Sequence, residues 1–296
     1  MLTHKKPLSI LAMARPLLLI VISPIYLIGS LIARDVGFRW DSRLFWWGLL
    51  TLLPAVLAAN YANEYTDFQT DALTDRTPFS GGSGVLVQDV SLRRTAIWAV
   101  WFFTLMGMAL AWVGFRAGAL NPSAIFLWVV GTFVGIAYSL PPFKLAWRGW
   151  SEAVNAALIG LLLPLYGYAV QSGRLNWLVL IGCIPFSLLV FVFILSTNWA
   201  DRDADRAVGK YTLSARLTQT HLRRLYAGSA FLGFALQPFL IGAILPKEVV
   251  LSSLPAIPFL IWAGTRYTRI HSPHPTVIAL LILLPLQLAA WVIVGM

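Results

Sequence analysis

Hydrophobic residues fill the chain in long, nearly uninterrupted stretches. About 20 apolar residues give a helix enough length to cross the hydrocarbon core of a membrane. Nine stretches reach about that length, although Pro255 and Pro258 interrupt the eighth. The pattern therefore predicts nine membrane-spanning helices, at about residues 14–33, 44–62, 95–114, 122–140, 153–171, 176–198, 225–245, 248–264 and 275–294.

The composition also indicates a polytopic membrane protein. The 296 residues are 58% hydrophobic and 11% charged, whereas soluble domains carry about 25% charged residues. The predicted spans use nearly the whole chain, so we expect one all-α transmembrane domain over residues 1–296. The first apolar segment is about twice as long as a signal-peptide core and lacks a clear cleavage pattern, which predicts a retained helix. Cys183 is the only cysteine, which excludes an intramolecular disulfide.

The positions of Lys and Arg predict the orientation, because cytoplasmic loops are enriched in both. With a cytoplasmic N-terminus, only six of these residues fall outside: Arg34, Arg39, Arg43, Arg116, Arg174 and Lys247. The net charge of +10 then reflects cytoplasmic loops near anionic lipid, and we expect no nucleic-acid partner. We expect an integral protein of a prokaryotic-type inner membrane, with the C-terminus on the outer side.

Acidic residues are concentrated in two short stretches. Residues 60–75 read NYANEYTDFQTDALTD, and residues 198–210 read NWADRDADRAVGK. Seven of the 12 acidic residues lie there: Glu64, Asp67, Asp71, Asp75, Asp201, Asp203 and Asp205. A spacing of four places side chains on one helix face, and this spacing joins Asn63, Asp67, Asp71 and Asp75, and also Asp201 and Asp205.

Both stretches fall at predicted cytoplasmic helix ends, and their chemistry suits a bound cation. Crowded carboxylates repel one another in a low-dielectric setting. Oxygen ligands suit Mg²⁺, which is commonly held by one or two carboxylates together with substrate phosphates. Neither stretch contains His or Cys, which argues against zinc and copper. We expect the two stretches to hold Mg²⁺ bound to a diphosphate, and the alternative is that they are simply water-exposed helix ends. The expected metal ligands are Asn63, Asp67, Asp71, Asn198, Asp201 and Asp205.

Several cationic side chains lie where they could neutralise a diphosphate. Arg76 precedes the loop SGGSG, whose backbone N–H groups could bind an anion. Lys144 and Arg148 are four residues apart in YSLPPFKLAWRGWSE, although interfacial anchoring explains them equally well. Lys210 lies in a loop beyond a glycine and can reach inward. Arg15 lies early in the first span, where an interfacial anchor is the alternative.

Taken together, these segments resemble the UbiA superfamily of intramembrane prenyltransferases. The similarity is carried by NEYTDFQTD, DRTPFSGGSGVLV, YSLPPFKLAWRGWSE and NWADRDADRAVGKYTLSARL. The segment TPFSGGSGVL is most similar to the branch of 1,4-dihydroxy-2-naphthoate prenyltransferases. Glu64 departs from the pattern, because the family usually has Asp after the motif Asn.

The resemblance implies helices around a cavity open to lipid, Mg²⁺ as cofactor, a polyprenyl diphosphate donor and an aromatic acceptor. The acceptor it favours is 1,4-dihydroxy-2-naphthoate in menaquinone biosynthesis, with a 4-hydroxybenzoate- or homogentisate-like ring, a chlorin or haem, or a glycerol-phosphate lipid as alternatives. It implies catalysis by Asp67, Asp71, Asp201 and Asp205, and diphosphate binding by Arg76, Lys144, Arg148, Lys210, Tyr138 and Arg15. A cation-coupled transporter is the alternative class. Transport sites lie near the bilayer midplane, whereas these acids are predicted at the cytoplasmic helix ends.

Overall fold

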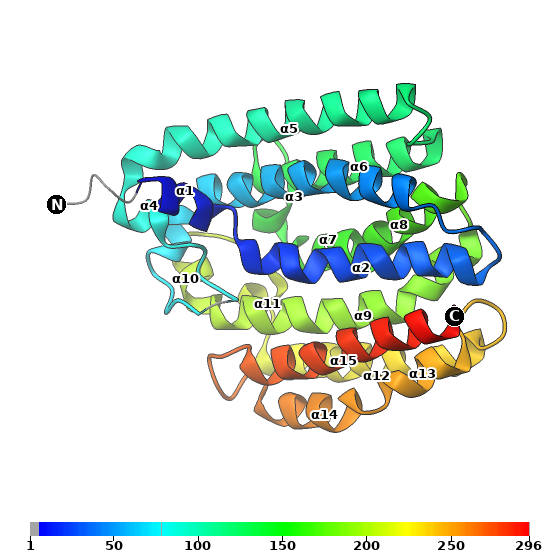
Figure 1. Cartoon of the computed structure of the whole chain (residues 1–296). Helices are drawn as coiled ribbons and strands as arrows, with labels where there is room; N and C mark the ends of the chain where they lie inside the picture. The colour runs from blue at the N-terminus through cyan, green and yellow to red at the C-terminus, as the bar shows by residue number, and fades with distance from the viewer. Residues whose placement is uncertain (1–5, 78, 296) are drawn as a thin grey trace.

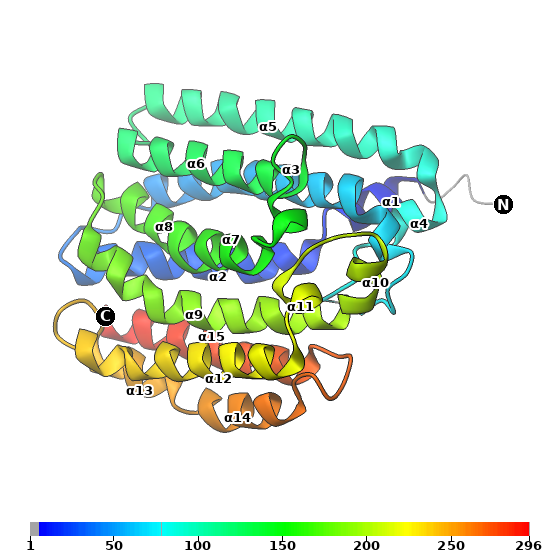
Figure 2. The ribbon, with the colours of Figure 1, turned by 180° about the vertical axis from the view of Figure 1, so that it is seen from behind.

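The computed structural model describes residues 6–77 and 79–295, and it confirms the all-α class. Most of the described residues are helical, and the described part of the chain contains isolated β-bridges but no strand. The long helices run side by side as one bundle (Figures 1 and 2). Residues 1–5, which the sequence predicts to be cytoplasmic, lie outside the described residues.

The first half of the chain supplies four long helices and several short ones. In order they are α1 Lys6–Met13, α2 Pro16–Asp35, α3 Ser42–Asp71, α4 Val85–Gln88, the 3₁₀ turn η1 Val90–Leu92, α5 Arg93–Arg116 and α6 Pro122–Ser139. The second half begins with the 3₁₀ turn η2 Leu145–Arg148, α7 Ser151–Ala157, the π-helical segment η3 Leu158–Leu162 and α8 Leu163–Ser172. It continues with α9 Trp177–Ala200, α10 Arg202–Ala207, α11 Leu213–Arg216, α12 Gln219–Ala235, η4 Gln237–Leu240, α13 Lys247–Ser253, α14 Ala256–Arg266 and α15 His274–Val294.

Eight helical segments of the described chain are long and apolar enough to cross a membrane. They coincide with eight of the nine predicted spans, and the interrupted eighth stretch is indeed broken between α13 and α14. The remaining prediction, residues 225–245, corresponds to α12 and η4. Helix α12 has 17 residues and begins with the polar sequence QTHLRR, so it does not reach the required length and apolarity. The count of nine therefore stays a prediction.

Side-chain caps explain where three of the long helices begin. Asp41 accepts hydrogen bonds from the backbone N–H groups of Arg43 and Leu44 at the start of α3. Asn121 and Asn176 cap α6 and α9 in the same way. Such caps satisfy backbone donors that have no partner within the helix. These polar residues therefore separate consecutive hydrophobic helices.

The length of α3 places the first acidic stretch. At about 1.5 Å per residue, its 30 residues extend about 45 Å, which exceeds a hydrocarbon core of about 30 Å. The polar sequence falls in the last turns of the helix. The short helices α1, α4, α10 and α11 gather around this end of the bundle in both views (Figures 1 and 2). The fold therefore collects its polar loops around the end of α3.

Packing between the long helices is apolar and close. One large hydrophobic cluster joins α2, α3, α6, α8, α9, α13 and α15, and two smaller clusters flank it. At Gly29 a side-chain carbon would overlap the backbone of Pro164, so α2 and α8 approach at backbone distance. Large apolar side chains on α5 point outward, including Trp98, Phe102 and Trp112. An apolar outer surface suits contact with lipid.

Candidate active site

The two acidic stretches meet at the end of the bundle where α3 finishes. Helix α10 packs against α3, and Lys210 lies between the two stretches. Its Nζ is 2.9 Å from Oδ2 of Asp67 and 3.4 Å from Oδ1 of Asp205. Burial alone would lower the pKa of Lys210, but the carboxylates of Asp67 and Asp205 hold that pKa well above its usual value. The cation expected between the acids is thus, in part, a lysine of the chain itself.

Both carboxylate oxygens of Asp67 accept hydrogen bonds. Its Oδ2 accepts from Asn63 Nδ2 at 2.9 Å as well as from Lys210, and its Oδ1 accepts from Trp147 Nε1 at 2.8 Å. The ammonium of Lys144 lies over the ring of the same Trp147, 4.6 Å from its centroid. The segment after α6 therefore reaches the acids, with Lys144 at its edge.

The second stretch retains buried acceptor capacity. Oδ1 of Asp201 is buried without a hydrogen-bond partner among the described residues, and Oδ1 of Asp205 is buried with the ammonium of Lys210 3.4 Å away. Asp205 is fully buried, and its other oxygen accepts from Thr212 Oγ1 at 3.3 Å. Burial raises the pKa of Asp201 to about 7 and that of Asp205 to about 6. Buried carboxylate oxygens without a donor are suited to receive a cation.

The donor set fits Mg²⁺ in the presence of a diphosphate. Hard oxygen donors from both stretches face one region, and Oδ1 of Asp201 has no hydrogen-bond partner among the described residues. Within residues 6–77 and 79–295, no three carboxylate, imidazole or thiolate groups come close enough to hold a metal by themselves. Mg²⁺ commonly takes one or two carboxylates and completes its shell with water and phosphate oxygens. The phosphates of a ligand would supply the missing donors.

A buried glutamate fixes the Gly/Ser-rich loop beside the first stretch. Glu64 is 1% exposed and accepts from the backbone N–H of Ser83 at 2.8 Å and from its Oγ. Arg15, between α1 and α2, donates to the same carboxylate, with Nε 2.8 Å from Oε1. Glu64 therefore joins α3, the loop and the start of α2 in one ionic network.

The glycines of this loop allow it to contact the acids. Gly82 has φ +60, and a side-chain carbon on it would overlap the carboxylate of Asp71. Arg76 is exposed and donates from Nε to the carbonyl of the same glycine at 3.0 Å. Only glycine suits both the conformation and the close approach. The predicted anion-binding loop thus lies directly against Asp71.

A chain of hydrogen bonds joins Tyr138 to the second stretch. The hydroxyl of Tyr138 and Oγ of Ser151 are 2.8 Å apart, and Nδ2 of Asn198 donates to the same Oγ at 3.0 Å. Neighbouring Glu152 is fully buried and accepts from the backbone N–H groups of Leu213 and Ser214. The beginning of α7 therefore positions Tyr138, Asn198 and the segment after α10 relative to one another.

Other predicted or candidate side chains lie apart from the acids. Arg148 is exposed and donates to the carbonyl of Pro142, so it closes its own turn. Arg202 and Arg206 donate to the carbonyls of Leu217 and Ala215. They connect α10 to the segment around α11. Asp75 lies exposed in the loop after α3.

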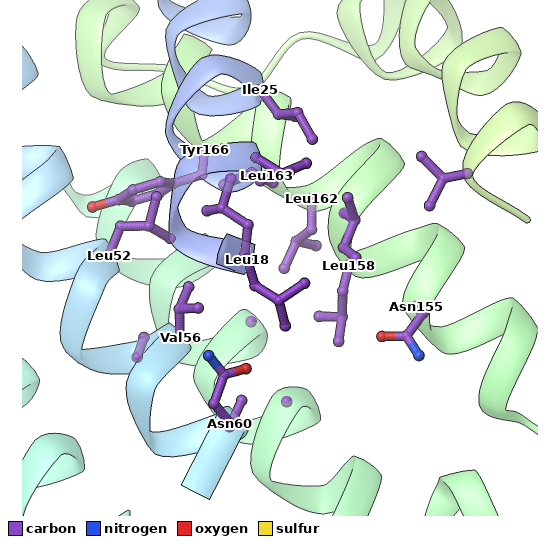
Figure 3. A pocket seen from close by; sticks show the side chains of 18 of the residues that line it. Leu18, Ile25, Leu52, Val56, Asn60, Asn155, Leu158, Leu162, Leu163 and Tyr166 are labelled. Atoms are coloured by element: carbon purple, nitrogen blue, oxygen red, sulfur yellow. The ribbon is translucent and has the colours of Figure 1, made fainter. Parts of the chain in front are cut away.

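An apolar cavity of about 300 Å³ lies within the bundle (Figure 3). Its wall comes from α2, α3, α6, α7, η3, α8, α9 and α15, and it includes leucine side chains such as Leu18, Leu52 and Leu162. Asn60 also lines it, three residues before Asn63 on α3. The cavity therefore begins beside the polar residues and continues into the apolar interior.

Three contacts of this site could not be recognised in the sequence. Trp147 reads equally well as an interfacial belt residue, and nothing in the sequence pairs it with Asp67, 80 positions away. Ser151 is an ordinary small polar residue in a sequence pattern. Ser83 belongs to a run typical of flexible loops, and only its contact with Glu64 shows that it is fixed.

Known proteins resemble this chain in sequence. It is 28% identical over 209 residues to the 1,4-dihydroxy-2-naphthoate octaprenyltransferase of Mycobacterium leprae, covering 67% of each chain. It is 23% identical to the 2-carboxy-1,4-naphthoquinone phytyltransferase of Synechocystis sp., covering 72% of this chain and 66% of that protein. A 1,4-dihydroxy-2-naphthoate octaprenyltransferase of Bacillus subtilis is 24% identical over 64% of this chain and 59% of its own. The chain thus spans about two thirds or less of these relatives.

The fold is shared with solved structures, and the family follows from the sequence. A UbiA homolog from Archaeoglobus fulgidus, bound to DMAPP and Mg²⁺, superposes with a TM-score of 0.70 at 17% identity, over 97% of this chain and 98% of that one. A structure concerning digeranylgeranylglyceryl phosphate synthase superposes with a TM-score of 0.66 at 15% identity, over 99% of both chains. The model of the UbiA prenyltransferase family matches residues 22–294, nearly the whole chain, which therefore belongs to this family of membrane prenyltransferases.

Proposed function

We propose that this protein transfers a polyprenyl group from a polyprenyl diphosphate to an aromatic acceptor within the membrane, in a Mg²⁺-dependent reaction. The acceptor we propose is 1,4-dihydroxy-2-naphthoate, as named for the relatives from Mycobacterium leprae and Bacillus subtilis. The observation that carries the proposal is the meeting of Asp67 and Asp205 around Lys210 beside a large apolar cavity. A diphosphate with a long hydrocarbon tail has the same division into a charged and an apolar part.

The metal ligands we propose are the carboxylates and amides of the two acidic stretches. They are Asn63, Asp67 and Asp71 from α3, Asn198 from α9, Asp201 between α9 and α10, and Asp205 from α10. Support comes from the buried Oδ1 of Asp201, which has no hydrogen-bond partner among the described residues, and from the DMAPP and Mg²⁺ bound to the Archaeoglobus fulgidus homolog. When bound, Mg²⁺ supplies electrostatic stabilisation of the diphosphate leaving group.

The chain's own cations have the second role. Lys210 lies inside the cluster, while Arg15, Lys144 and Arg76 lie around it and can balance the charge that develops as the diphosphate leaves. Tyr138, hydrogen-bonded to Ser151, belongs to the same proposed diphosphate site. Arg148 stays in the proposal as a peripheral contact, because an exposed side chain can leave the Pro142 carbonyl for a phosphate.

The apolar cavity has the third role. As the allylic C–O bond of the donor breaks, the prenyl carbon becomes electron-deficient and would react with any nearby water. The leucine-rich wall excludes water, so that an electron-rich ring carbon of the acceptor forms the new C–C bond. That ring carbon then loses the group it carried, a hydrogen as a proton or a carboxylate as carbon dioxide, and the bonding electrons restore the aromatic ring.

The proposed location follows from the same assignment. The chain is an integral membrane protein. We place it as one domain in the inner membrane of a prokaryotic cell, surrounded by lipid, with the acidic end toward the cytoplasm. A diphosphate donor made in the cytoplasm would then reach the site directly, and the product would remain in the bilayer.

The test is a product assay on the full-length protein in lipid nanodiscs. Radiolabelled polyprenyl diphosphate and 1,4-dihydroxy-2-naphthoate are added with Mg²⁺ or with EDTA. We expect a prenylated naphthalenoid and released diphosphate only with Mg²⁺. Diphosphate release with another ring or with a glycerol-phosphate lipid, but not with the naphthoate, would overturn the acceptor. No diphosphate release with any acceptor would overturn the reaction itself.

A further inference from the structure

Asn155 lies where the polar end of the bundle meets the apolar cavity. It is on α7, one turn beyond Ser151, the residue that binds Tyr138 and Asn198. The π-helical segment η3 begins three residues later, and π segments within α-helices are frequently found at functional sites. Figure 3 shows the Asn155 amide beside the cavity, with the Asn60 amide on a different wall.

The side-chain amide of Asn155 has no hydrogen-bond partner among the described residues, which distinguishes it from the other polar groups of the cavity wall. Asn60 donates to the carbonyl of Ala14 at 2.8 Å. The remaining hydroxyl and indole groups of the wall donate to nearby oxygens. These groups belong to Thr132, Tyr166 and Trp128. An unpaired amide facing an apolar cavity costs free energy unless a ligand supplies a partner.

The proposed prenyl donor supplies no hydrogen-bond partner for the side-chain amide of Asn155. A polyprenyl tail carries no hydrogen-bonding group, and the diphosphate is assigned to the acids and cations of the two stretches. The oxygen substituents of an aromatic acceptor are the polar groups left to bind. Because Asn155 is one turn from the residue that holds Asn198, an acceptor bound there lies between the diphosphate site and the apolar cavity.

We propose that Asn155 is a specificity residue that hydrogen-bonds an oxygen substituent of the aromatic acceptor, a proposal that rests on the prenyltransferase function above. Its Nδ2 donates to a phenolic or carboxylate oxygen, and its Oδ1 accepts from a phenolic O–H. The contact selects rings that carry oxygen next to the prenylated position. It also orients the reacting carbon, because an otherwise apolar pocket gives little angular preference.

The test compares Asn155→Leu and the smaller Asn155→Ala with wild type in nanodiscs. Loss of one such hydrogen bond raises the KM for 1,4-dihydroxy-2-naphthoate about 10- to 100-fold, in the range for a bond to a charged group. The KM for polyprenyl diphosphate and the Mg²⁺ requirement stay unchanged. The matched control is Thr104→Val on α5, which does not line the cavity and whose hydroxyl donates to the carbonyl of Val100 in its own helix. Its KM for the naphthoate stays within about twofold of wild type.

An analogue and a binding titration complete the design. With 1,4-dihydroxynaphthalene, which lacks the carboxylate, wild type and the Asn155 variants differ less than with the naphthoate. Equilibrium binding of the naphthoate, followed by tryptophan fluorescence, measures affinity without turnover. Equal affinities in wild type and both variants overturn the proposal, as does a parallel loss for donor and acceptor. Failure of the prenyltransferase function appears instead as absent diphosphate release in wild type.

Discussion

At the scale of single residues, Lys210 is the group on which the cluster depends. It is buried, and its Nζ contacts carboxylates of both acidic stretches. Lys210→Met leaves these carboxylates without their cation, so we expect diphosphate release to fall about 100-fold at saturating Mg²⁺. Lys247→Met is the control, because that lysine is exposed and pairs only loosely with Glu248 at 4.0 Å. A rate within threefold of wild type for Lys210→Met would contradict this role.

Glu64 is expected to act on stability first. Glu64→Gln removes the charge that holds Arg15 and weakens the contact with Ser83. We expect the free energy of unfolding to fall by roughly 2 kcal/mol. This is less than for a fully buried ion pair, because part of Arg15 reaches solvent. This corresponds to a Tm lowered by about 4 °C in detergent. Glu64→Asp keeps the charge and should lose less; an unchanged Tm for Glu64→Gln would argue against the network.

The sequence predicts the acidic residues of the site but not the side chains that contact them. The acids are identifiable because Asp is rare in this chain and recurs at helical spacing. Their partners are not identifiable in the same way. Trp147 and Asn155 are ordinary residues of an interface and a helix, and only the fold brings Trp147 to Asp67 and exposes Asn155 to the cavity.

At the scale of elements, Gly82 allows the loop between α3 and α4 to lie against Asp71. Gly82→Ala introduces a side chain that overlaps Asp71, so the loop must move away. We expect about a tenfold loss of product formation, assayed with both substrates and Mg²⁺. Gly173→Ala separates this effect from backbone strain, because Gly173 has φ +76 and open space around it. Equal losses for both variants would show that strain alone is responsible.

Hydrophobic stretches predict helices reliably but not their irregularities. The four spans nearest the N-terminus and the last helix coincide with the predicted ranges to within a few residues, except that α3 continues into its acidic stretch. The π-helical segment η3 could not be predicted, because one extra residue per turn leaves no distinct trace in an all-apolar sequence. The pattern predicts a span at 225–245, whereas α12 covers Gln219–Ala235, since Pro238 and Gly242 divide the apolar stretch.

At the scale of the whole molecule, the distribution of Lys and Arg predicts that the acidic end of the bundle faces the cytoplasm. Cys183 is buried and unique, so a Cys183→Ala chain is a clean background for single cysteines. We expect Ala117→Cys, in the exposed turn after α5, to react with an impermeant maleimide in intact cells. Asp203→Cys, at the acidic end, should react only after the cells are opened. The reverse labelling pattern would contradict a cytoplasmic active site.

The whole fold also explains why a few short sequence segments identify the family. The four diagnostic segments come from separate parts of the chain, and the structure gathers them at one end of the bundle (Figure 1). The resemblance to UbiA prenyltransferases is confirmed by the family match over residues 22–294. The proposed acceptor contact, Asn155 on the cavity wall, is marked by no spacing in the sequence.

The most direct test of the central claim is a double-mutant comparison of the two acidic stretches. Diphosphate release is measured for Asp67→Ala, Asp201→Ala, the double variant and Asp203→Ala, whose exposed side chain lies in the sequence between the proposed ligands Asp201 and Asp205. If both stretches form one diphosphate site, each single variant loses at least about 100-fold, the double variant loses little more, and Asp203→Ala remains near wild type. Additive losses, or single variants as active as Asp203→Ala, would contradict the account.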